Sequence, residues 1–355
     1  MKALLLLLAT GLPAAAEITA VAHPEEKFPA ESTAVWTPLF QATWDKLGKY
    51  HGGKPERVEP PNALISRLDS FRWDSPTVMP DSGWQTWAGP ATEEFLEQVN
   101  RETGTSLGNE EAPFHLRNQA PGAVAAFGIL DREVSFPEAF FRSTKLPLRF
   151  AAEGEAREVR FFGVKGEKSA DFTGTVKVLA YRPSEKSHAL QLSCRGTDET
   201  IVLFRPPAAQ DFATACLWLR EWRKEWRERP ETALEYNDVR LHRLDVVKVP
   251  YLKLETVKDF AGELGSMRFY KGEEVPRRIV RAEQKVEFEL HERGARVRAE
   301  VSIEDAFGDE PEPPPVYPRI FSYDAPFFVF LWRERAEWPY VGAWIGNADA
   351  MQAWE

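Results

Sequence analysis

The sequence predicts an α+β fold built around antiparallel β-sheets, and three observations lead to this class. The chain begins with helical patterns of apolar residues. From about residue 146 it continues mostly with segments in which apolar and polar side chains alternate, the period that is typical of strands. It closes with two aromatic runs joined by a charged turn, which predicts a buried hairpin. Helices followed by runs of strands are typical of α+β architecture, and no internal repeat is found.

The first 16 residues have the composition of a secretory signal peptide. Lys2 gives a basic start, an apolar run extends from Ala3 to Leu12, and three alanines precede Glu17. The apolar run is shorter than the roughly 20 residues that a membrane-spanning helix needs. We therefore expect cleavage near Glu17, a single domain over residues 17–355, and export to the periplasm or the extracellular space without a membrane anchor.

Composition limits the partners and the covalent links. The chain of 355 residues carries a formal net charge of −10, and no basic patch is evident, which argues against nucleic acid as a partner. Cys194 and Cys216 allow at most one internal disulfide, and an exported protein permits one. Spacing alone does not show that the sulfurs meet, so two buried free thiols remain the alternative.

The first third of the chain predicts two helices and one central strand. Residues 32–47 indicate a short strand, a break at Pro38 and a buried helix. Residues 50–92 are rich in Pro, Gly and Ser and are expected to be irregular. Thr92 caps a second predicted helix that ends near Gly104. The continuous apolar run Gly122–Leu130 is short enough for a central strand.

The middle of the chain predicts a series of strands separated by turns, at residues 146–152, 157–164, 175–181, 188–194 and 199–206. A helix capped by Asp211 follows. Its Trp218, Trp222 and Trp226 lie four residues apart, a stripe that we interpret as core contact rather than a sugar-binding surface. A strand over 245–255, a helix over 257–267 with Gly265 near its end, and a strand over 281–294 complete this part.

The stretch after Gly294 alternates without interruption. Its apolar residues are Ala295, Val297, Ala299, Val301 and Ile303, with polar or charged residues between them. This pattern predicts a strand antiparallel to Lys285–Leu290, with the reversal around Glu292–Gly294, because alternation on both segments fixes register. Gly294 can take the positive φ of a tight reversal. The alternative is a free loop, continuous with the acidic, proline-rich residues 305–318.

Catalytic and metal-binding motifs are missing from the sequence. The six histidines include no pair with the spacing of a zinc protease. There is no G-x-S-x-G elbow, P-loop or clear dinucleotide fingerprint, and neither cysteine lies in an activating context. The sequence therefore predicts no catalytic residue, no metal and no cofactor, and the protein is not expected to be an enzyme.

Eight segments follow one another along roughly residues 32–355: "VWTPLFQATWDKL", "FLEQVNRETGTSL", "AVAAFGILDREVSFPEAF", "VRFFGVKGEKSADF", "VKVPYLKLETVKDFAGELGSM", "FELHERGA", "FSYDAPFFVFLW" and "YVGAWIGN". In their wording and their order they resemble the serpin family. Each motif alone is weak, but their colinear order is specific. The resemblance implies a serpin-like fold of mixed and antiparallel sheets with helices packed around them. The helical region between Thr37 and Gly128 is shorter than is usual in the family.

The resemblance also implies a mechanism. A serpin offers an exposed loop as bait to a serine or cysteine protease, and the cut loop inserts as a strand into the central sheet, releasing stored strain. The equivalent loop is residues 294–320. Its bait position falls near Gly308 and Asp309. Its hinge is the set Gly294, Ala295, Val297 and Ala299.

Several positions depart from the family pattern. The polar cluster under the central strands, the shutter, maps onto Thr37, Phe40, Gly128 and Gln284, and only Thr37 keeps the chemistry. Phe136 stands where the family has a Trp. The outward hinge residues Arg296, Arg298 and Glu300 are bulky and charged, and "EPEPPP" after Asp309 is poor bait. The sequence thus predicts a non-inhibitory binding or scaffold module with an unknown protein partner; the alternative is an active inhibitor of a serine-type protease, acting as a suicide substrate.

Overall fold

The largest layer of the protein is a seven-stranded sheet that is buried on both faces. In this computed structural model the described residues are 18–107, 114–116, 122–152, 154–207, 211–228, 239–270, 273, 276–279, 281–295 and 318–354. The strand order is β1 (Thr19–Val21), β2 (Ala34–Trp36), β22 (Val341–Ile345), β21 (Phe327–Arg333), β13 (Glu199–Arg205), β12 (Ser187–Ser193) and β11 (Val176–Arg182). The predicted C-terminal hairpin is confirmed as β21 and β22.

Strand β21 shows why this sheet needs apolar residues at every position. Phe327, Val329 and Leu331 enter the main core, whereas the alternate residues Phe328, Phe330 and Trp332 enter a second core on the opposite face. Helix α5 (Phe212–Glu228) covers that second face through residues such as Cys216 and Leu219. A strand buried on both faces reads as a continuous apolar run.

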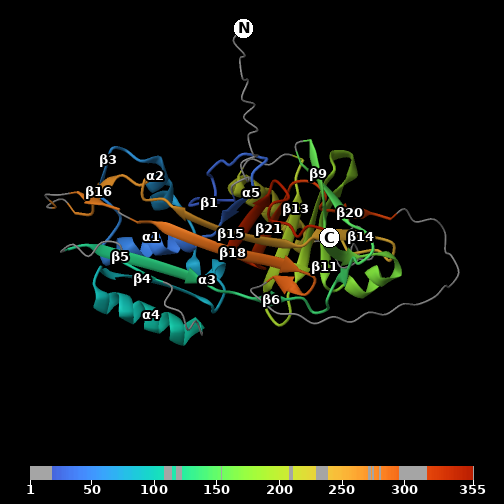
Figure 1. The fold of residues 1–355 in the computed structure, drawn as a ribbon, viewed down its shortest axis with the longest axis horizontal. Helices are drawn as coiled ribbons and strands as arrows, with labels where there is room; N and C mark the ends of the chain where they lie inside the picture. The colour runs from blue at the N-terminus through green and yellow to red at the C-terminus, as the bar shows by residue number, and fades with distance from the viewer. Residues whose placement is uncertain are drawn as a thin grey trace, which may run out of the picture.

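Two further layers lie beside this sheet (Figure 1). One has the order β20 (Ile320–Ser322), β14 (Val246–Pro250), β10 (Phe161–Val164) and β7 (Phe141–Arg142). The other is the hairpin of β8 (Leu148–Ala152) and β9 (Glu155–Val159). Two strands that the sequence predicts as continuous are each divided between sheets, at Arg160 and at Tyr251. The Tyr251 amide donates to the Arg160 carbonyl at 3.1 Å, so the two points at which the chain passes from one sheet to another lie side by side.

The fourth layer positions the candidate site. It consists of β15 (Leu252–Asp259), β18 (Glu283–His291), β19 (Gly294–Ala295) and β6 (Val134–Ser135). Beside it stands a separate antiparallel pair, β4 (Trp84–Pro90) and β5 (Val124–Leu130). Helix α1 (Leu39–Tyr50) packs against both β4 and β5, and α4 (Glu93–Leu107) contacts β4 (Figure 1). The strand predicted from Gly122–Leu130 exists, but within the described chain it pairs with β4 alone and is not central.

Two predictions about local structure are wrong. Residues 50–92 hold β3 (Arg57–Glu59), α2 (Ala63–Ser70), α3 (Ser75–Val78) and β4. The helix expected over 257–267 is replaced by the end of β15, a turn, and β16 (Ser266–Arg268), which pairs with β3 and β17 (Arg277–Arg278). Because β15 pairs with β18 along its whole length, cross-strand contacts override the local helical pattern.

Helix caps and the tryptophan stripe follow the sequence more closely. The Phe95 amide donates to Thr92 Oγ1 at 3.3 Å, and the Thr214 amide donates to Asp211 Oδ1 at 2.6 Å. Helix α4 continues past Gly104 to Leu107. Trp218 and Trp222 both lie edge-on to Phe204 in the second core, although Trp218 keeps 38% of its surface exposed.

Candidate functional site

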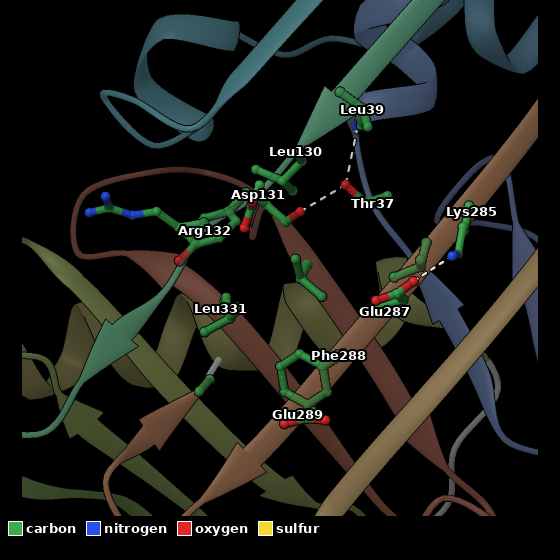
Figure 2. A pocket seen from close by; sticks show the side chains of 14 residues that line it. Thr37, Leu39, Leu130, Asp131, Arg132, Lys285, Glu287, Phe288, Glu289 and Leu331 are labelled. Atoms are coloured by element: carbon green, nitrogen blue, oxygen red, sulfur yellow. Dashed lines mark hydrogen bonds and ion pairs between the residues drawn. The ribbon is translucent and has the colours of Figure 1, made fainter. Parts of the chain in front are cut away.

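The candidate site is the gap between the end of β5 and strand β18, where the edges of these two layers face each other. A cavity of about 80 Å³ lies in this gap, lined by Thr37, Leu39, Leu130–Arg132, Lys285–Glu289, Ala295, Leu331, Tyr340 and Val341 (Figure 2). Arg132 is fixed in the wall because its Nε donates to Oε1 of the buried Glu199 at 2.9 Å. Backbone edges that face a gap can accept another strand.

Strand β19 closes one end of the gap. Gly294 and Ala295 pair with His291 and Leu290 of β18 on one side, and with Ser135 and Val134 of β6 on the other. Gly294 has φ +148°, and a Cβ there would lie 2.1 Å from the Val134 carbonyl oxygen. Glycine is therefore required at this reversal.

A buried carboxylate holds the turn before β19. Arg142 Nε donates to Glu292 Oε1 at 2.7 Å, and the Tyr251 hydroxyl donates to Oε2 at 2.9 Å. The Phe140 amide donates to the Glu292 carbonyl at 2.8 Å. Burial acts to raise the pKa of Glu292, but the hydrogen bonds from Arg142 and Tyr251 outweigh it and hold that pKa below its ordinary value. The side chain is thus an ionised anchor for this turn.

The comparisons with known proteins bear on this geometry. No protein-family model and no curated protein matches the sequence. A cleaved serpin 42Da covers 72% of this chain and 65% of its own, with 12% identity and a TM-score of 0.45. The native-state structure of a thermophilic serpin, tengpin, matches over 90% of both chains with a TM-score of 0.54 and 8% identity. This chain has the serpin fold.

Within the serpin fold, three of the four shutter-equivalent positions gather at the start of α1. The Thr37 hydroxyl donates to the Tyr340 carbonyl at 2.9 Å and accepts from the Leu39 amide at 3.2 Å. The Phe40 ring packs edge-on against Phe260 at 4.9 Å. Gly128 faces α1 closely: a Cβ there would lie 2.2 Å from Thr43 Oγ1. Phe40 therefore makes an aromatic contact and Gly128 packs closely against α1, and neither brings a polar side chain to its position.

The fourth position, Gln284, lies on β18. Its side chain is buried, and neither its amide nitrogen nor its amide oxygen has a partner in the described part of the protein. Buried polar atoms without partners are rare. Among the described residues, no polar side chain therefore joins Gln284 to rebuild the family's polar cluster.

The chain that follows residue 317 has its own anchor. Asp245, just before β14, is buried and pairs with Arg319, just before β20. Arg319 Nη2 lies 2.6 Å and Nε 3.1 Å from Asp245 Oδ2, and the Arg319 amide donates to Oδ1 at 3.0 Å. Buried carboxylates thus hold the chain on both sides of residues 296–317.

The sequence predicted the reversal around Glu292–Gly294 but carried no sign of the side chains that hold it. The structure confirms the predicted reversal and the pairing of Ala295 with Leu290; Val297, Ala299, Gly308 and Asp309 lie outside the described residues. Arg142 is 150 residues from Glu292, and Asp245 is 74 from Arg319. Such pairs carry no local signal. Phe136 packs edge-on against Phe140 at 4.9 Å and its amide donates to the Arg293 carbonyl at 2.7 Å, so it helps to hold the turn before β19.

Other expected features can be placed as well. Cys194 and Cys216 are free and buried, so the alternative of two thiols is the one observed. No group of three or more metal-ligating side chains occurs among the residues that the structure describes. In the same part of the chain, no helix is long and apolar enough to cross a membrane.

Proposed function

We propose that this chain is an exported, non-inhibitory serpin-fold protein that binds a protein partner. Export is supported by the leader-like residues 1–16. The absence of an enzymatic role is supported by the lack of catalytic motifs in the sequence, and by a fold that is typical of protease inhibitors rather than enzymes.

One observation carries the non-inhibitory reading: the start of the hinge is already a sheet strand in the intact chain. Gly294 and Ala295 pair on both sides, and Glu292 is held by Arg142 and Tyr251. In a serpin inhibitor the energy of insertion is released only after the loop is cut. A hinge that is paired before cleavage leaves less of that energy to trap a protease.

A second candidate function is an active inhibitor with its bait at Gly308 and Asp309. The observation in its favour is the gap itself. Within the described chain β5 pairs only with β4, and a cavity of about 80 Å³ separates it from β18. A protease would then be the partner, and the cut segment would enter the gap.

Incubation with proteases distinguishes the two. We expect no SDS-resistant complex at the summed mass with trypsin-, chymotrypsin-, elastase- or subtilisin-like enzymes. A Gly308→Arg variant offers trypsin a clear cleavage point, and should be cut as a substrate with a small change in melting temperature. A covalent band with either protein, or a large gain in melting temperature after the cut, would establish the inhibitor instead.

A further inference from the structure

The outer edge of β4 is a free strand edge. Strand β4 pairs with β5 on one side, and among the residues that the structure describes it has no strand partner on the other. In Figure 1, β4 lies on the side of β5 that is turned away from β18. An unpaired edge offers a row of backbone donors and acceptors to another strand.

Two hydrogen bonds that flank β4 show which of its backbone groups face outward. The Asp131 amide donates to the Gly83 carbonyl at 2.7 Å, and the Ala91 amide donates to the Ala123 carbonyl at 2.9 Å. Both bonds continue the register between β4 and β5, so the odd-numbered residues of β4 are the ones bonded to β5. Bonded and non-bonded pairs alternate in an antiparallel ladder. The even-numbered residues therefore point their amides and carbonyls to the free edge.

This outward set is short and symmetric. Its members before the strand ends are Trp84, Thr86 and Ala88. All three keep part of their surface exposed. At one end the set is closed by Pro90, which has no amide hydrogen and whose carbonyl accepts from the Thr92 amide at 2.8 Å. Thr86 is therefore the centre of a row of three donors and three acceptors.

Strand β4 lacks the devices with which proteins protect strand edges. Its sequence, WQTWAGP, contains no charged residue. The edge strand β11 instead carries Lys177 and Arg182, together with a break in its register with β12. The edge strand β15 carries Lys253 and Lys258, and the Lys253 amide donates to the Ala350 carbonyl at 2.7 Å. Because lysines, bulges and covering segments prevent edge-to-edge pairing, β4 is the edge that remains able to pair.

A second copy of this chain fits the edge about a twofold axis at Thr86. In antiparallel self-pairing Thr86 lies opposite Thr86 of the second copy, and Trp84 lies opposite Ala88 of the second copy. Every outward amide and carbonyl in the row is then bonded, and no charged residues of the two strands face each other. A Thr–Thr pair is favourable across strands, and a large side chain fits beside a small one.

The acidic start of α4 does not oppose this pairing. Phe95 lies against Gly89, whereas Glu102 accepts from the Trp87 indole at 2.7 Å, so α4 runs back along β4. Its acidic first turn therefore lies at the Pro90 end of the strand. At roughly 3.4 Å per residue this end is about 14 Å from the axis, and the two acidic turns are about 27 Å apart along the strands. Charges at that distance are screened, because the Debye length at physiological ionic strength is about 8 Å.

We infer that the free edge of β4 is a dimer interface, in which two copies of this chain pair their β4 strands antiparallel about Thr86. The product is one continuous four-stranded sheet with the order β5-β4-β4-β5. The interface lies on the side of β5 away from the gap that faces β18. The inference therefore goes beyond the proposed function and does not depend on whether the chain inhibits a protease.

Sedimentation equilibrium of the exported chain over a wide range of concentrations tests the inference. We expect a monomer–dimer equilibrium for the native protein. Thr86→Lys and Thr86→Glu each place like charges opposite each other at the axis, and each should weaken association about tenfold or more. An equimolar mixture of the two variants should restore the dimer, because Lys then faces Glu. This rescue requires that position 86 meets itself.

Ile320→Lys is the matched control, because Ile320 is 53% exposed and lies on another edge strand, β20. It makes the same change in charge as Thr86→Lys and should dimerise like the native protein. Ala88→Pro serves if a charge at position 86 prevents folding, since it removes an outward amide that β5 does not use. Circular dichroism confirms the fold of each variant.

Amide exchange at residue resolution separates this edge from any other interface. Protection of the amides of Trp84, Thr86 and Ala88 should rise with protein concentration. The amides of Gln85 and Trp87, which face β5, should be protected at every concentration. A monomer at all concentrations, or a dimer that both Thr86 variants leave intact, would overturn the inference. Outward amides that are protected in the monomer would also overturn it, because the chain itself would then cover the edge.

Discussion

The hydroxyl of Tyr251 donates a 2.9 Å hydrogen bond to Oε2 of Glu292, tying the start of β15 to the turn that leads into β19. Both side chains are buried. Burial, together with the neighbouring Glu292 carboxylate, raises the pKa of Tyr251 above its ordinary value, so the phenol remains a donor. The turn before β19 is therefore held by a group that lies 41 residues away in sequence.

Removing the anchor carboxylate should destabilise the protein. Glu292→Gln removes the buried charge that Arg142 and Tyr251 hold, and we expect a loss of about 2 kcal/mol in the free energy of unfolding; the loss is smaller than for a fully buried ion pair because the Arg142 side chain is 38% exposed. Urea unfolding measures it. Tyr251→Phe should cost about 1.5 kcal/mol, the value of one hydrogen bond to a charged group. Glu155→Gln is the control, since the side chain of Glu155 is 80% exposed; a similar loss there would contradict the anchor role.

Stability should fall as the solution is acidified below pH 6.5. Burial, with the charge of Arg205, lowers the pKa of His188 to about 3, and burial with Arg67 lowers that of His23 to about 4. The unfolded chain titrates near 6.5 and so takes up protons first, which stabilises the unfolded state as the pH falls. At pH 5 each histidine should remove about 2 kcal/mol relative to pH 7.5.

The variant His188→Gln isolates this effect. Its unfolding free energy should change less between pH 7.5 and pH 5 than that of the native protein, by about the contribution of one histidine. His115→Gln, which alters an exposed histidine, is the control for replacing a histidine by glutamine. Equal slopes for the native protein and His188→Gln would show that this site does not titrate as described.

The anchor at the far end of the loop gives a parallel test. Asp245→Asn removes the charge that pairs with Arg319 and should lower the unfolding free energy by about 3 kcal/mol, with faster amide exchange across Ile320–Ser322. The comparison is Asp349→Asn, whose partner Arg157 at 2.9 Å is 56% exposed. An exposed pair contributes at most about 1 kcal/mol, so equal effects would count against the Asp245 anchor.

Gln284 is a position where a substitution should stabilise the protein. Gln284→Met keeps the side-chain length and removes two buried amide atoms that have no partner in the described chain. We expect a gain of about 1 kcal/mol in the unfolding free energy, because leaving a buried polar group unsatisfied is unfavourable. Gln191→Met should instead lower the unfolding free energy, since Gln191 Oε1 accepts a hydrogen bond from Arg223 Nε at 2.8 Å. Destabilisation by Gln284→Met would indicate a partner for this amide.

The export prediction rests on residues 1–16, which lie outside the described chain. We expect the mature protein to begin at or near Glu17. Intact-mass measurement of protein recovered from the periplasm or the medium gives the answer directly. A mass that includes the first 16 residues would contradict the predicted leader.

Much of the local structure could be read from the sequence. The caps at Thr92 and Asp211, the aromatic hairpin of β21 and β22, and the alternation of β18 follow from side chains a few residues apart. So does the reversal at Gly294, since a glycine between two alternating runs indicates a tight turn. The sequence therefore determined the α+β class, most strands, and the place of the reversal at Gly294.

Only the tertiary structure decided which strands pair with one another and which buried side chains meet. The run 257–267 is not a helix because β18 pairs along β15 to Asp259. Residues 124–130 do not form a central strand, because one edge of β5 pairs with β4 and the other faces the gap. The chain passes from β14 to β15 at Tyr251, where the Tyr251 amide bonds to the Arg160 carbonyl between β9 and β10. The anchors Arg142–Glu292 and Asp245–Arg319 join residues far apart in the chain. Local pattern reports only on nearby side chains, whereas pairing partners and buried ion pairs are fixed by contacts that exist once the layers have packed.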